Sequence, residues 1–175
     1  MKQSLVLVLI CFACCFSVIG QRNAKPPQPF IDRGACPFEC CTYRDWDVNE
    51  STVVRKEMNE RSAVAFKLKK GERVVGLTGV VVTTRPGIAT VLKAEKIGNL
   101  NLKKGDTVYV LTYLGEGFNK IWHKGRIVEA DTFDTSKFRF SQQPKAVWWV
   151  KVKNRRGQTG WSKQPEHFGN MDQCG

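Results

Sequence analysis

The sequence predicts an all-β protein in which one or two small barrels follow a cleaved signal peptide and are stapled by disulfides. Short runs of β-branched and aromatic residues, separated by turn residues, fill most of the chain after residue 50. An eleven-residue segment occurs twice, and a cysteine cluster follows an apolar N-terminus. No segment has the pattern of an amphipathic helix longer than two turns.

The first 20 residues have the order of a secretory signal peptide. Lys2 supplies the positive charge, an apolar run covers residues 5–19, and Gly20 offers a small residue at a cleavage site. This run is shorter than the roughly 20 apolar residues of a membrane-spanning helix, so we expect export and no transmembrane span. Lipid attachment at Cys14 or Cys15 is less favoured, because apolar residues continue after them.

Residues 21–35 are predicted to form a proline-rich tether. The motif KPPQP at 25–29 favours an extended, polyproline-like backbone. Such a segment is a spacer and not part of a core. We therefore place the folded part of the chain after it.

The internal repeat indicates two similar β units. LKKGERVVGLT at 68–78 recurs as LKKGDTVYVLT at 102–112, and seven of the eleven positions are identical. In each copy the Lys-Lys-Gly-acid sequence predicts a tight turn, and the Val, Leu and Thr residues after it predict a strand. We expect residues 36–97 to hold the cysteine cluster and a degenerate unit. Residues 98–175 are expected to hold a barrel and a C-terminal tail.

A strong strand pattern covers residues 146–153, and a hairpin turn follows it at NRRG. Alternation along the strand places Trp148 on the face that we expect to be the core. The opposite face carries Trp149, Lys151 and Lys153. Trp149 is therefore the tryptophan that we expect at the surface.

Four cysteines remain after cleavage of the signal peptide: Cys36, Cys40, Cys41 and Cys174. An even number in an exported chain favours disulfides. Cys174 has no neighbouring cysteine, so we expect it to reach back to the cluster while Cys36 closes a short loop with Cys40 or Cys41. The preferred pairing is Cys36–Cys40 with Cys41–Cys174.

Two other uses of the cysteines are disfavoured. Cys36 and Cys40 have a spacing that suits zinc, but the second ligand pair of a structural zinc site is missing. A cysteine peptidase needs a histidine beside its thiol, and His123 and His167 lie in strand or loop sequence without the helix-rich domain of such enzymes. We predict no catalytic residue, metal or cofactor.

The chain is strongly basic. It carries 28 Lys and Arg against 16 Asp and Glu, a net charge of +12. Loss of Lys2 with the signal peptide leaves +11, which favours polyanionic partners such as surface polymers, acidic lipids or nucleic acid. The basic residues form two clusters: Lys67, Lys69, Lys70 and Arg73, and Lys151, Lys153, Arg155 and Arg156.

WVKV at 149–152, followed by GQTGW at 157–161, resembles the closing hairpin of bacterial SH3-like (SH3b) domains. That hairpin carries a tryptophan, a Lys-Val pair, a glycine turn and a Gly-Trp step. The resemblance extends over about residues 102–168, with a looser match over about 51–96. It implies small barrels of five to six strands that bind peptides or cell-wall polymers through exposed aromatic side chains.

The resemblance suggests a ligand-binding surface around Trp149, whose face also carries Lys151 and Lys153. The other candidates for this surface are Tyr113, Phe118, Pro165 and Phe168.

These observations predict a secreted or periplasmic, non-catalytic module that binds cell-wall peptide or an anionic envelope polymer. One alternative is a protein-partner or structural role in the envelope. Another is the binding of polyanions or nucleic acid through the basic clusters, beside Trp149. Export disfavours nucleic acid, because partners outside the cytoplasm are more often surface polymers.

Overall fold

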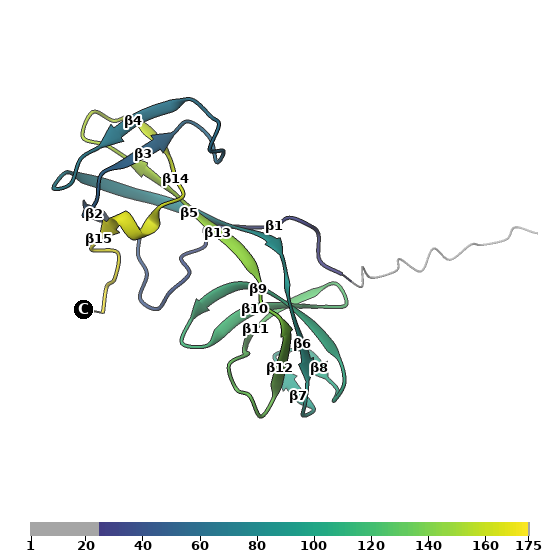
Figure 1. Cartoon of the computed structure of the whole chain (residues 1–175). Coiled ribbons are helices and arrows are strands. Elements are labelled where there is room, and N and C mark those ends of the chain that lie inside the picture. Colours follow the sequence, from purple (N-terminus) through teal and green to yellow (C-terminus); the bar gives the residue numbers. More distant parts are fainter. Residues whose placement is uncertain (1–24, 175) are drawn as a thin grey trace, which may run out of the picture.

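A computed structural model describes residues 25–174, so the predicted signal peptide lies outside the described residues. The described chain is all-β, as predicted, with a single turn of 3-10 helix, η1 (Pro165–His167). The strands form two large curled sheets and one two-stranded hairpin, arranged in two lobes (Figure 1).

The first lobe combines strands from both ends of the described chain. Its sheet has the order β15-β2-β5-β13-β14-β3-β4, with β1 paired to β5. The strands are β1 (Phe30–Arg33), β2 (Asp45–Val48), β3 (Thr52–Arg55), β4 (Val64–Leu68), β5 (Arg73–Arg85), β13 (Lys145–Lys153), β14 (Thr159–Ser162) and β15 (Phe168–Gly169). Its core is built around Trp46, Val54, Val150 and Val152, none of which is more than 1% exposed.

The second lobe lies between β5 and β13 in the sequence. Its five-stranded sheet has the order β11-β10-β9-β6-β12, and β7 and β8 form a separate hairpin. The strands are β6 (Gly87–Val91), β7 (Glu95–Ile97), β8 (Leu100–Leu102), β9 (Thr107–Gly115), β10 (Phe118–His123), β11 (Arg126–Asp131) and β12 (Phe138–Gln142). Val108, Val110, Ile121 and Phe138 are among the residues of its core.

The two lobes are joined by the long antiparallel pair of β5 and β13 (Figure 1). This ladder runs from Lys145 opposite Arg85 to Lys153 opposite Val75. Because β13 and β14 pair with strands of the first lobe, the closing hairpin completes that lobe and not the second one. The predicted division into 36–97 and 98–175 therefore differs from the observed one, in which the second lobe is an insertion.

The internal repeat corresponds to equivalent turns in the two lobes. The backbone N–H of Lys69 donates to the Glu72 carboxylate (2.8 Å), and that of Lys103 donates to the Asp106 carboxylate (2.9 Å). The glycine of each turn has a positive φ, 87° in one and 89° in the other, a conformation that glycine adopts without strain. Strand order is also equivalent, with β15-β2-β5-β13-β14 matching β12-β6-β9-β10-β11.

The two cores differ at one pair of equivalent positions. In the first lobe Trp46 packs flat over Gly76, where an added Cβ would lie 2.5 Å from the indole ring. In the second lobe Ala89 takes the place of Trp46 on the strand next to the repeat, and Val110 takes the place of Gly76. A tryptophan that packs over a glycine in the first lobe is thus replaced by an alanine and a valine in the second, so the two cores are filled differently at this pair of positions.

The two predicted disulfides are present, but the preferred pairing is wrong. Cys36 bonds to Cys41, and Cys40 bonds to Cys174. The reason is the path of the C-terminal tail, because the backbone N–H of Gln173 donates to the Cys40 carbonyl at 3.0 Å. This contact brings Cys174 to Cys40 and leaves Cys41 for the short loop.

Candidate functional site

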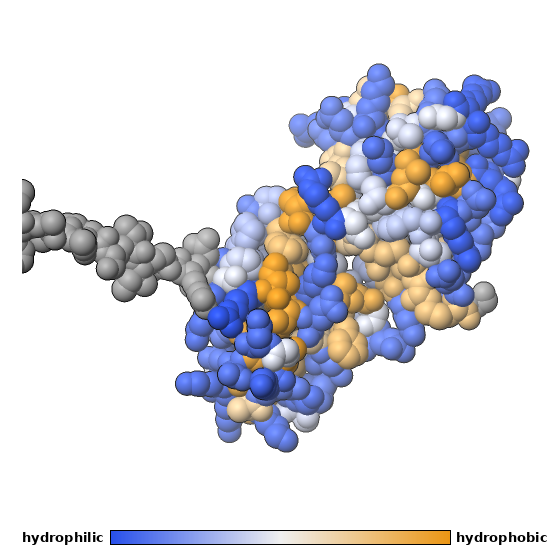
Figure 2. All heavy atoms as spheres, turned by 180° about the vertical axis from the view of Figure 1, so that it is seen from behind, coloured by the Kyte–Doolittle hydropathy of each residue, from blue (hydrophilic) through white to orange (hydrophobic). Residues whose placement is uncertain are grey.

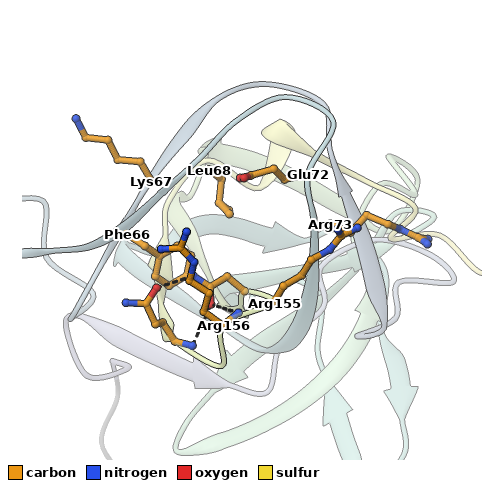
Figure 3. Close-up of a pocket in the computed structure, with 9 residues that line it drawn as sticks. Phe66, Lys67, Leu68, Glu72, Arg73, Arg155 and Arg156 are labelled. Carbon is orange, nitrogen blue, oxygen red and sulfur yellow. Dashed lines mark hydrogen bonds between the residues drawn. The ribbon is translucent and has the colours of Figure 1, made fainter.

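A basic hollow in the first lobe is the leading candidate for a functional site (Figure 3). It has a volume of about 470 Å³ and lies between β4, the start of β5 and the turn that joins β13 to β14. It is lined by Phe66, Lys67, Leu68, Glu72, Arg73, Asn154, Arg155, Arg156 and Gln158. We call this site the basic hollow.

A second, shallower depression of about 220 Å³ adjoins the basic hollow and shares Arg73, Asn154 and Arg155 with it. Lys153 and Asp45 also line this depression. Members of the two predicted basic clusters, about 80 residues apart in the sequence, therefore meet at one surface: Lys67 and Arg73 from the first, and Lys153, Arg155 and Arg156 from the second. Lysine and arginine dominate there, because Glu72 and Asp45 are the acids that line the two depressions.

Most of these cations have no partner within the described chain. Lys67, Lys153, Arg155 and Arg156 form no ion pair there, and the side chains of both arginines make no hydrogen bond among residues 25–174. Arg73 differs, because its Nε lies 3.1 Å from an Asp47 carboxylate oxygen. An unpaired group of like charges raises the local positive potential and attracts anions.

The turn that carries the two arginines is fixed by its own hydrogen bonds. The Asn154 side-chain oxygen accepts from the backbone N–H of Arg156 and of Gln158, both at 3.0 Å. Gly157 has a φ of 78° and its N–H donates to the Asn154 carbonyl (2.9 Å). The backbone is thereby held while the guanidinium groups stay free, an arrangement that suits bidentate binding of oxyanions.

The second lobe uses the equivalent place for an internal contact. Its hairpin turn carries Lys124, whose Nζ lies 3.9 Å from the Asp106 carboxylate, and His123 Nε2 lies 3.5 Å from the same group. Asp106 is the repeat equivalent of Glu72. The unpaired basic surface is therefore a property of the first lobe and not of the repeated fold.

The structure does not gather the predicted ligand-binding residues at one place. Trp149 is only 7% exposed and Phe168 only 3%, so neither offers an aromatic surface to a ligand. Trp149 lies opposite Val80 in the middle of the β5–β13 ladder, where both faces of the strands are covered. Period-2 alternation could not predict this, because it assumes that one face of the strand meets solvent.

The remaining candidates are divided between the lobes. Tyr113 and Phe118 are 40% and 46% exposed and belong to the second lobe. Pro165 begins η1 in the first lobe. The Lys151 Nζ lies 5.7 Å from the centre of the Trp161 ring, in a cation–π contact. Of this set, Lys153 is the residue that lies at the basic surface.

The cysteine segment, residues 35–43, contacts both lobes, and we call it the clasp. Phe38 packs edge-on against Trp148 of β13, with 6.0 Å between ring centres, and an added Cβ on Gly115 of the second lobe would lie 2.6 Å from the Glu39 nitrogen. The carboxylate of Glu116, next to Gly115, repels that of Glu39 and raises its pKa. The cysteine segment therefore meets the second lobe at Gly115, beside a pair of like charges.

Tyr43 ties the two ends of the cysteine segment together and packs on the first lobe, with 5.6 Å between the centres of its ring and the Trp46 ring. Its hydroxyl donates to the Ala35 carbonyl, and burial raises the pKa of Tyr43 to about 12. The phenol is therefore neutral at physiological pH. It acts as a structural hydrogen-bond donor.

The described residues hold one group of potential metal ligands, Cys40, Asp172 and Cys174, whose ligand atoms lie within 4.8 Å of one another. Cys40 and Cys174 are bonded to each other, so their sulfurs are not thiolates and do not suit zinc. We therefore interpret this group as part of the disulfide-bonded segment and not as a metal site.

Comparisons with known proteins give no relative from which a function of the basic hollow can be inferred. No protein-family model, no curated protein and no solved structure matches this chain.

Proposed function

We propose that the protein is a non-catalytic binding module that acts outside the cytoplasm and holds an anionic polymer of the cell envelope in the basic hollow. The observation that carries this proposal is the meeting of two distant basic clusters at one surface, with four of their cations unpaired within the described chain. Unpaired cations repel one another. A polyanion that neutralises them would relieve this repulsion.

Two disulfides support the extracytoplasmic part of the proposal, because such bonds persist in oxidising compartments. All four cysteines from residue 25 to residue 174 take part in them, which leaves no free thiol in that range for a cysteine peptidase. Residues 25–174 contain no helix that is long and apolar enough to span a membrane.

The repeated strand order supports the resemblance to SH3-like barrels. Each lobe contains an equivalent set of five strands, to which the first lobe adds β1, β3 and β4. Known binding preferences of such barrels include cell-wall polymers, which is consistent with an anionic envelope ligand. The hollow lies between a hairpin turn and the repeat turn. Its location is inferred from the residues of this chain and not from the resemblance.

Nucleic acid is the runner-up ligand, and the composition of the hollow disfavours it. Proteins that bind single-stranded nucleic acid combine basic residues with exposed aromatic side chains on which bases stack. Phe66 is the aromatic residue that lines the hollow, and it is partly buried against the core of the first lobe. A polymer whose charge is not accompanied by bases fits this surface better.

Binding to purified sacculi before and after extraction of their anionic polymers tests the proposal. We expect the oxidised protein to bind untreated sacculi and to lose binding after extraction, while added polyphosphate competes and single-stranded DNA of equal charge competes less well. Replacement of Arg155 and Arg156 by glutamine should reduce binding. The matched control replaces Arg33 and Arg85, two exposed arginines outside the hollow, and should not.

The proposal is wrong if extraction leaves binding unchanged, or if both double variants lose binding equally. Stronger competition by DNA would favour the runner-up.

A further inference from the structure

A second hollow, mainly apolar, lies on the second lobe. Its volume is about 560 Å³, and it is lined by Leu92, Thr132, Phe133, Thr135, Phe138, Arg139, Phe140 and Gln143. Its base includes Phe138, which is 3% exposed, and its rim includes Phe133, which is 62% exposed. Figure 2 shows apolar residues gathered in patches on an otherwise hydrophilic surface, including patches on this lobe.

This apolar hollow runs along the edge of a sheet. Three consecutive residues of β12, from Phe138 to Phe140, line it. Successive side chains of a strand point to opposite faces, so a depression that touches all three lies beside the strand. In the sheet order of the second lobe, β12 is the last strand, and no strand of the described chain pairs with its outer side.

The outer edge of β12 carries backbone groups that are free to pair. Both backbone groups of Val91 bond on the β9 side, because its N–H donates to the Asp106 carbonyl (2.9 Å) and its carbonyl accepts from the Gly105 N–H (2.8 Å). Val91 lies opposite Phe138, so this pair exchanges no ladder hydrogen bonds and the backbone groups of Phe138 face away from β6. Because these groups alternate along an antiparallel strand, those of Phe138 and Phe140 point outward. The Phe138 N–H is already used by the Asp134 carbonyl (3.0 Å). The Phe138 carbonyl and both backbone groups of Phe140 remain.

We propose that this edge accepts a short extended peptide segment of a partner protein, which adds to β12 as a further strand. Strand addition combines main-chain hydrogen bonds with pockets for alternate side chains. Here the apolar hollow would receive one apolar side chain, and Arg139 would face an acidic residue. Arg139 is the charged residue that lines the hollow, so charge complementarity favours an acidic flank.

The edge is suited to a short segment and not to continued sheet growth. β12 has five residues, its register shifts between Phe140 and Gln142, and Pro144 follows it. Short edges, irregular register and proline all limit edge-to-edge association. A second copy of β12 would also bring two Arg139 side chains together. These features favour a foreign peptide over a second copy of the chain.

Exposed Phe133 gives the proposal a matched pair of variants. Phe133 stacks on Tyr113 with 5.9 Å between ring centres and lines the hollow, whereas Phe118 is also an exposed phenylalanine of the second lobe but does not line it. Replacing either by alanine removes a similar solvent-facing ring. Only the Phe133 change should affect a peptide in the hollow.

The probe is a fluorescent hexapeptide of alternating valine and serine with aspartate at both ends, and binding is followed by fluorescence anisotropy. We expect saturable binding, roughly five- to tenfold weaker for Phe133→Ala and unchanged for Phe118→Ala. A lysine-ended peptide should bind more weakly to the wild type and better to Arg139→Glu. N-methylation of the valine nearest the middle of the peptide should weaken binding. The bound peptide should also slow hydrogen exchange of the Phe140 amide.

The proposal is overturned if no peptide binds at millimolar concentration or if Phe118→Ala weakens binding as much as Phe133→Ala. It is also overturned if protection of the Phe140 amide rises with protein concentration alone, which would show that a second copy occupies the edge. Because this site and the basic hollow lie on different lobes, either can fail without the other.

Discussion

The Cys40–Cys174 disulfide should contribute far more stability than the Cys36–Cys41 disulfide. The first closes a loop across 134 positions and the second across 5. In the chain-entropy model these loops correspond to about 5 and about 2 kcal/mol, respectively. We therefore expect the double variant Cys40→Ser/Cys174→Ser to lose about 3 kcal/mol more than Cys36→Ser/Cys41→Ser.

Hydrogen bonds hold the C-terminal tail in place around the Cys40–Cys174 disulfide. The Arg44 side chain bonds to the Asn170 side chain (2.8 Å) and to the Asp172 carbonyl. The Thr42 N–H donates to the Met171 carbonyl at 2.8 Å. These bonds keep the tail in place without the disulfide, so its loss acts mainly on the unfolded chain.

Urea unfolding, followed by tryptophan fluorescence, measures both variants. For a slope of about 2 kcal/mol per molar urea, a loss of about 5 kcal/mol lowers the midpoint by roughly 2.5 M. The Cys40/Cys174 variant should also have the steeper slope, since its unfolded state exposes more surface. Equal losses in the two variants, or a larger loss for Cys36/Cys41, would refute the reasoning from loop length.

Two further predictions concern the clasp and the first core. Repulsion from Glu116 raises the folded-state pKa of Glu39. The repulsion therefore destabilises the folded protein above that pKa, and this loss of stability disappears as the pH falls below the ordinary pKa of glutamate. Glu116→Gln should therefore raise the urea midpoint at pH 7 but not at pH 3, with Glu129→Gln as a control, and a gain at both values would contradict this. Gly76→Val should cost about 3 kcal/mol because of overpacking against Trp46, but much less in a Trp46→Ala background. A double-mutant cycle measures this coupling, and additive effects would show that the packing is not shared.

The sequence was sufficient for the elements that depend on local chemistry. The Lys-Lys-Gly-acid turns form in both lobes as predicted, since a glycine with positive φ and a capping carboxylate act within a few residues. The use of the four cysteines as two disulfides also follows from their even number and from the export that the N-terminal pattern predicts. The exact partners of Cys40 and Cys41 depend on the path of the tail, which no local pattern specifies.

The insertion of one lobe into the other could not be predicted in this way. β5 and β13 are far apart in the sequence, and their alternation is compatible with many partners. For the same reason, the burial of Trp149 and the proximity of Arg73 to Arg155 could not be predicted from the sequence. The basic clusters were visible in the sequence, but their convergence depends on long-range pairing.

The dependence of binding on salt tests the basic hollow most directly. Each lost contact with a phosphate or similar anion should lower the slope of log K against log salt by about one. We predict that Arg155→Gln/Arg156→Gln lowers the slope for polyphosphate by about two, whereas Arg33→Gln/Arg85→Gln, which removes the same net charge, leaves it nearly unchanged. Equal slopes in the two variants would show that binding responds to net charge alone and would contradict a localised site.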